Sequence, residues 1–244
     1  MNEVPQLSAD AVVAALRAVS PAPDSKRVAD LQRFFKTEPG GYGEGDRFLG
    51  PTVPQTREIA KQFRGLPLDQ LDLLLDSQWH EVRLTALHIL VGQFNRAKTR
   101  VLRTELFDFY MHAVHRGAVN NWDLVDTSAP QLGKLLVEQP RKTLIIKLAK
   151  SDNLWERRVA IMFTFAHIRA GEFGVPQHIS MILLHDEHDL IHKAVGWMLR
   201  EIGNRDIEVL RAFLAKFHKE MPRTMLRYAI EKLDAVERAK WMAK

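Results

Sequence analysis

Two residues of one predicted helix could do chemistry together, Trp122 and Asp126. The preceding Asn120 and Asn121 are typical helix N-caps, which puts Asp123 in the first turn and Trp122 and Asp126, four residues apart, on one face. An indole face attracts cations, and a carboxylate adds a full negative charge or positions a water, so this pair suits a cationic substrate. The alternative is a core Trp beside a solvated acid.

A second motif, residues 151–158, places cations where a helix does not usually have them. Asp152 or Asn153 can cap a helix there, so Arg157 and Arg158 fall in its first turns, where the helix dipole favours acids. This pattern indicates an anionic ligand. Because the two side chains point about 100° apart, we expect one to face a groove and the other to form a surface ion pair.

A third motif, residues 193–201, carries one stripe of three residues. Lys193, Trp197 and Arg200 fall at i, i+4 and i+7 of a predicted helix. Such a stripe could hold a nucleic-acid backbone and stack on its sugars or bases. Trp197 as ordinary core filling is the alternative.

Several other chemistries find no motif. The chain has no Cys, which excludes a disulfide framework, a cysteine nucleophile and a thiolate metal site. The glycine-rich segment 38–51 has no preceding strand and no following Gly-Lys-Ser/Thr, and Glu44 and Asp46 would repel phosphate, so we predict a structural loop. The segment 185–192 lacks His-Glu-x-x-His spacing, and neither a Gly-x-Ser-x-Gly elbow nor a dinucleotide fingerprint occurs. We expect no metal and no cofactor.

The elements that must position these residues are helices. Apolar residues repeat at helical spacing, as in Val82, Ala86, Leu87 and Leu90, and short breaks at 65–67, 139–141 and 221–223 separate the runs. Cations precede apolar helical faces at positions 83, 158, 193 and 227, in steps close to one or two units of about 35 to 40 residues. The sequence therefore predicts an all-α, HEAT-like or armadillo-type helical-repeat solenoid with a concave basic face. Alternatively, the cations only solvate helix starts.

Length and composition set the remaining expectations. The chain has 244 residues, 46% hydrophobic and 27% charged, typical of a globular protein. We predict one all-α domain over 1–244, with about the first 25 and last 10 residues as end caps. The net charge of +5 favours an acidic partner such as nucleic acid. Residues 1–5 lack a signal-peptide pattern and no apolar stretch is long enough to span a bilayer, so we expect a bacterial cytoplasmic protein that does not bind membranes.

With these motifs in view, the chain resembles the AlkD-like family of DNA glycosylases, which are HEAT-like-repeat DNA alkylation repair proteins. The resemblance covers about residues 25–235. It rests on four stretches in the right order, residues 42–50, 121–126, 151–160 and 193–201. Each stretch alone is weak, but together with the helical repeat they are specific.

The resemblance implies roles for individual residues. Asp126 matches the family's catalytic carboxylate, and Trp122 and Trp197 match aromatics that cradle the damaged nucleotide. Arg158 matches the cation beside them. Phe34 falls where the family often has Tyr, so a hydroxyl is missing while the apolar contact remains. We expect the DNA backbone to contact four further cations: Arg57, Arg83, Lys193 and Arg200.

The implied function is a DNA glycosylase that excises cationic N3- or N7-alkylated purines from duplex DNA in base excision repair. The family recognises damage along the backbone without a deep base pocket, unlike enzymes that flip bases. Double-stranded DNA with alkylated bases is the expected partner and a monomer the expected state. A non-catalytic HEAT-like module that recognises DNA shape is the alternative, and a protein-binding scaffold is a third possibility.

Overall fold

The computed structural model describes residues 7–243 and is helical nearly throughout. The chain divides into two compact units, Met1–Ser128 and Ala129–Lys244. The parts of both predicted end caps at residues 1–6 and 244, including the start that lacks a signal-peptide pattern, lie outside the described residues. The expected all-α fold of helical repeats is confirmed, and the predicted breaks at 65–67, 139–141 and 221–223 fall between helices or at a helix start.

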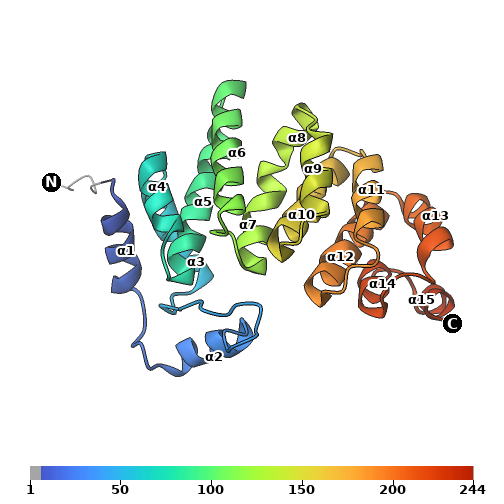
Figure 1. The fold of residues 1–244 in the computed structure, drawn as a ribbon, viewed down its shortest axis with the longest axis horizontal. Coiled ribbons are helices and arrows are strands. Elements are labelled where there is room, and N and C mark those ends of the chain that lie inside the picture. The colour runs from blue at the N-terminus through green and yellow to red at the C-terminus, as the bar shows by residue number, and fades with distance from the viewer. Residues whose placement is uncertain (1–6, 244) are drawn as a thin grey trace. The chain divides into compact units, whose positions relative to one another are not determined.

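The first unit contains seven helices or parts of helices within the described residues. Figure 1 shows α3 to α6 side by side, with α2 and the loop after it beyond one end of these helices. The helices are α1 (Ala9–Ala18), α2 (Lys26–Phe34), α3 (Val53–Gln62), α4 (Leu68–Leu75), α5 (His80–Arg96), α6 (Arg100–His115) and α7 (Trp122–Leu132). The end of α7 belongs to the second unit, because the boundary falls after Ser128.

The second unit continues the alternation of helices and short connections. Its central helices, α10 and α12, pack on each other and on the shorter helices beside them. Its helices are α8 (Lys134–Glu138), α9 (Lys142–Ala149), α10 (Leu154–Arg169), α11 (Gly174–Ile182), α12 (Asp189–Arg205), α13 (Ile207–Phe217), α14 (Arg223–Ala229) and α15 (Ala235–Met242).

Burial explains which helices are central. Helix α5 contacts α3, α4 and α6 and buries residues around most of its circumference, including Val82, Ala86 and Leu90. Such a helix lies within the core, whereas a helix with one apolar stripe lies at the surface. Helix α2 is of the second kind and buries only Val28. Helix α2 is attached to the rest of the unit by Arg27, which donates to the Gly50 carbonyl in the loop, and by Phe35, which packs on Phe48.

Candidate functional site

The start of α7 is fixed by its cap residue. Asn121 is fully buried, its Oδ1 accepts a hydrogen bond from the Trp122 backbone N–H at 2.9 Å, and its Nδ2 donates to Asp46 at 2.9 Å. Asp123 lies in the first turn. The predicted cap and helix start are confirmed. Trp122 and Asp126, four residues apart on this helix, are both half-buried, so both reach the surface of the first unit.

Aromatic rings from α2, the loop and α7 form one cluster. Phe35 stacks on Trp122 with 5.5 Å between ring centroids and on Phe48 at 5.1 Å. Phe34 meets Trp122 edge-on at 5.9 Å. Phe35 and Phe48 are buried, but Phe34 is 62% exposed. The cluster therefore presents one free ring, Phe34, beside the half-buried Trp122.

A buried imidazole lies between two carboxylates beneath this cluster. His80, the first residue of α5, contacts Asp46 through Nδ1 at 3.0 Å and Asp123 through Nε2 at 2.8 Å. Burial alone would lower the pKa of His80, but the charges and hydrogen bonds of the two carboxylates outweigh it and raise the pKa to about 9. The imidazole is therefore protonated at neutral pH, and it links the loop to α7.

Arg83 completes the same network and corrects one prediction. Its guanidinium pairs with Asp46 and donates to the Ser77 carbonyl at 2.7 Å and to Asn120 at 3.2 Å. Burial would raise the pKa of Asp46, but the hydrogen bond with His80 and the charge of Arg83 hold it below its usual value. Because Arg83 is 5% exposed, it supports the loop and is not free to contact a DNA phosphate as expected.

The glycine-rich loop is structural, as the sequence predicted. The buried Glu81 on α5 accepts hydrogen bonds from the backbone N–H groups of Leu49 at 2.9 Å and Gly50 at 2.8 Å. Gly50 has φ of +93°, a conformation that residues with a side chain rarely adopt. The loop thereby brings Asp46 and Phe48 against α5 and α7.

Asp126 lies one turn beyond Trp122, near a buried hydroxyl pair. The Ser128 hydroxyl donates to Tyr110 at 3.0 Å, and both side chains are buried. Burial raises the pKa of Tyr110 above its usual value, and the nearby charge of Asp126 adds to this effect. Asp126 is thus near the buried phenol, and the residue itself is half-buried.

In the second unit, the two adjacent Arg residues of α10 have different partners. Asn153 caps this helix by accepting from Trp155 N–H at 2.8 Å. Arg157 pairs with Asp186 at 2.6 Å, but the Asp186 side chain is only 6% exposed, so this is not the surface ion pair that the sequence predicted. Arg158 is buried and donates to the Leu190 carbonyl. Its guanidinium therefore connects the start of α10 with the start of α12.

The stripe on α12 also has partners. Lys193 pairs with Asp189 at 2.7 Å, and Arg200 pairs with Glu231. The indole Nε1 of Trp197 donates to Glu201 at 3.0 Å, and its ring lies 6.3 Å from that of Phe165. Trp197 is half-buried. This degree of burial does not decide between the two roles that the sequence left open, core filling and contact with a ligand.

The proposed site residues occur in both units. Phe34, Trp122 and Asp126 gather at the start of α7, and Arg57 is exposed on α3 of the same unit. Arg158, Lys193, Trp197 and Arg200 belong to the second unit. Sequence reasoning missed His80, Asp123 and Asp46 as one network. The sequence signal that could have indicated this network is Asp46 in the glycine-rich loop together with His80 and Glu81 at a predicted helix start.

Two kinds of feature are absent from residues 7–243. No group of three or more His, Asp or Glu side chains gathers there as metal ligands would. No helix in the described part of the chain has the length and apolar character needed to cross a membrane.

The fold and the site define an all-helical repeat protein with an aromatic and carboxylate pair at one helix start. The chain belongs to the DNA alkylation repair enzyme family, whose model matches residues 13–233. A solved structure described as a predicted DNA alkylation repair enzyme from Enterococcus faecalis is similar, with a TM-score of 0.69 and 16% identity over 89% of this chain and 99% of that chain. At this identity the similarity concerns the fold. None of the curated proteins compared with the chain matches it.

Proposed function

We propose that this DNA alkylation repair protein is a glycosylase that excises cationic N3- or N7-alkylated purines from duplex DNA. The observation that carries the proposal is the carboxylate of Asp126, which lies on α7 one turn from Trp122, and Trp122 belongs to the cluster with the exposed ring, Phe34. Carboxylate and aromatic faces together favour a cation over a neutral base. Membership of the repair family supports DNA as the partner.

The chemistry requires little from the enzyme at the base. Alkylation gives the purine a positive charge, so when the C1′–N bond breaks, its electron pair neutralises the leaving base without a general acid. Positive charge then develops on the deoxyribose. The carboxylate of Asp126 stabilises this charge and accepts a proton from the water that adds to C1′. No step in this reaction requires a metal or a cofactor.

The remaining residues bind and orient the nucleotide and its phosphates. In the first unit, Trp122 and Phe34 offer aromatic surface to the nucleotide, and Arg57 contacts the backbone. In the second unit, we assign Trp197 to the nucleotide and the cations Lys193 and Arg200 to phosphates, whereas Arg158, as buried as Arg83, positions the start of α12. Phosphate contacts fix position and register, so damage is recognised along the backbone without a deep base pocket.

The test is release of 7-methylguanine and 3-methyladenine from methylated duplex DNA. Asp126→Asn keeps the shape of the side chain and removes its charge, so we expect excision to fall at least about 100-fold while DNA binding is retained. Asp69→Asn, which changes an exposed carboxylate on α4, is the matched control and should excise at the wild-type rate.

Two results would overturn the assignment. Equal excision by wild type and Asp126→Asn would remove Asp126 from catalysis. Binding of methylated duplex by the wild type without release of any base would identify a non-catalytic module that recognises DNA shape.

A further inference from the structure

An apolar groove runs between α9 and α11 of the second unit. Its volume is about 260 Å³, and its walls are formed by Ile145 and Ile146 of α9 and by Val175 and Ile179 of α11. Ile145 and Ile179 are buried, whereas Ile146 and Val175 are half-buried and reach the surface. The two helices therefore present apolar side chains in a groove that residues 7–243 leave open.

Cations surround this groove, and acids do not. Lys142 lines the groove at the start of α9, and within residues 7–243 it has no ion pair. The segments that bound the groove, residues 139–150 and 173–185, contain four Lys or Arg residues and no Asp or Glu. An apolar groove with an unpaired cation at its edge is complementary to a segment that carries both apolar side chains and carboxylates.

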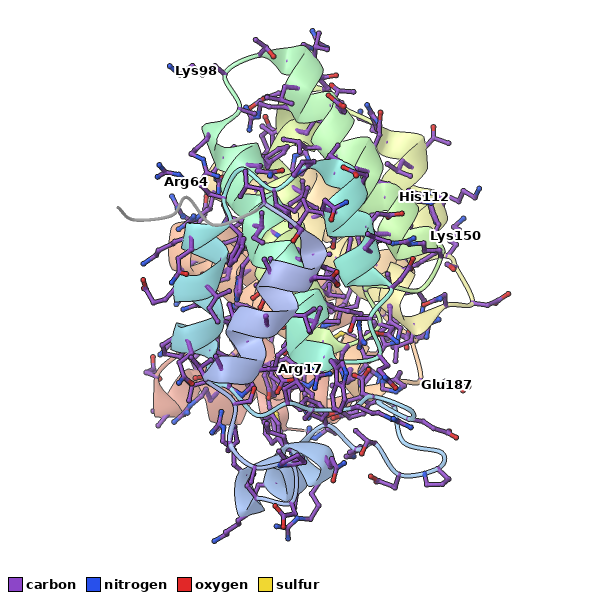
Figure 2. The ribbon with its side chains drawn as sticks, turned by 90° about the vertical axis from the view of Figure 1, so that its left-hand side faces the viewer. Arg17, Arg64, Lys98, His112, Lys150 and Glu187 are labelled. Atoms are coloured by element: carbon purple, nitrogen blue, oxygen red, sulfur yellow. The ribbon has the colours of Figure 1, made fainter. Side chains whose placement is uncertain are left out.

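A second hollow lies toward the ends of the same two helices. Its volume is about 450 Å³, and its lining includes Ile182 of α11 and Lys150, which follows α9 and is exposed at the molecular surface (Figure 2). Asp186 also lines this hollow, but its carboxylate is already paired with Arg157. Lys142 and Lys150 are about 12 Å apart along the helix, the length of about four residues of extended chain. The groove therefore suits a short polypeptide segment with a cation at each end.

Other kinds of ligand fit this groove less well. Contacts with a DNA backbone are made mainly by polar and charged groups, for which isoleucine walls offer no partner. Pockets for small molecules usually enclose about 300 to 1,000 Å³ and contain several convergent polar groups. The first hollow is smaller than this, and apart from Lys142 and His178 its lining is apolar or glycine. A protein segment is therefore the occupant that the charge and the apolar walls favour together.

We propose that the α9–α11 groove binds an acidic segment of a partner protein, with aliphatic or aromatic side chains against Ile146 and Val175 and a carboxylate beside Lys142. Apolar anchors in a groove supply affinity, and ion pairs at its edge supply orientation. The inference goes beyond the proposed function and does not depend on excision, because none of the residues proposed to bind DNA lines either hollow.

The test is selection of displayed random peptides of about 12 residues against the full chain, followed by affinity measurements on the best peptide. We expect the selected peptides to combine Asp or Glu with Leu, Ile or Phe. Lys142→Glu reverses the unpaired charge and should weaken binding at least about 10-fold, and Ile146→Gln should weaken it at least about 5-fold. The matched control Lys216→Glu makes the same charge change at an exposed position of α13 and should keep the wild-type affinity.

Several results would overturn the inference. A selection that yields no peptide or only peptides without acids would do so, as would equal weakening by Lys142→Glu and Lys216→Glu. Displacement of the peptide by undamaged duplex would assign the groove to nucleic acid. A dimer in sedimentation that Lys142→Glu dissociates would make a second copy of this chain the occupant. Lys142→Glu should release methylated purines at the wild-type rate, so failure of peptide binding and failure of excision by Asp126 are distinguishable.

Discussion

Two adjacent aromatic residues, Phe34 and Phe35, differ in burial and therefore in role. Phe35 is buried and stacks on both Trp122 and Phe48, so it holds α2 against the start of α7. Phe34, at the end of α2, has most of its ring in solvent. A large exposed ring contributes little to folding, and beside Trp122 it is available to a ligand.

We expect substitutions at these two positions to separate stability from activity. Phe35→Ala should lower the free energy of unfolding by about 3 to 5 kcal/mol, because it leaves a cavity among stacked rings. Phe34→Ala should change it by less than about 0.5 kcal/mol, yet reduce excision of methylated purines. Denaturant unfolding and base-release assays on both variants check this. A Phe34→Ala protein that excises at the wild-type rate would exclude Phe34 from the nucleotide site.

The proton on His80 makes part of the stability depend on pH. Its pKa is about 9 in the folded protein against 6.5 in the unfolded chain, so folding favours the protonated form. The contribution is complete below pH 6.5 and is lost as pH rises through about 9, and its limit is about 3 kcal/mol. The difference in unfolding free energy between wild type and His80→Gln should therefore shrink across this range. A constant difference would show that His80 binds no extra proton in the folded protein.

Sequence spacing identified some site residues and missed others for a physical reason. Trp122 and Asp126 are neighbours on a helix, and the helical repeat of 3.6 residues predicts their shared face. His80 lies 34 residues from Asp46 and 43 from Asp123 in the chain. Their contact depends on the path of the glycine-rich loop, which no local pattern encodes.

At the scale of elements, the cation that recurs near helix starts connects one long helix to the start of the next but one. Arg83 near the start of α5 donates to Asn120, just before α7, and Arg158 near the start of α10 donates to the start of α12. A cation before an apolar helical face gives the same sequence pattern whether its side chain is buried against a neighbouring helix or exposed at the surface. That ambiguity explains why Arg83 was expected at the DNA backbone, whereas its position makes it a connection between repeats.

We expect removal of this connection to take one of two cations from the buried carboxylate of Asp46, which His80 still contacts at 3.0 Å. Arg83→Gln should lower the free energy of unfolding by about 3 to 5 kcal/mol, whereas Arg57→Gln, at an exposed position on α3, should change it by less than about 0.5 kcal/mol. Adding Asp46→Asn to Arg83→Gln should recover part of the loss, since it removes a buried charge that has lost one of its two cations. Chemical denaturation of the wild type, Arg83→Gln, Asp46→Asn and the double variant measures this coupling. Strictly additive effects would contradict it.

For the whole molecule, the helical class and the repair family could be predicted from the sequence, because helical periodicity is local and the four motifs occur in order. The division after Ser128 could not, because it falls inside α7, where Pro130 does not end the helix and no linker separates the units. The single domain over 1–244 and the concave basic face stay predictions. The net charge of +5 did not predict how cations and acids pair, which depends on contacts between helices.

The paired cations of α12 have a consequence for movement along DNA. Lys193 and Arg200 already have carboxylate partners, Asp189 and Glu231, so a phosphate that reaches them replaces one partner with another. Such an exchange yields less binding energy than contact with an unpaired cation, and the displaced acid repels the same strand. A protein held by exchangeable contacts releases undamaged backbone readily and can slide to the next position. In the proposed complex with DNA, we therefore expect these acids to favour rapid scanning of intact DNA over long residence at any one site.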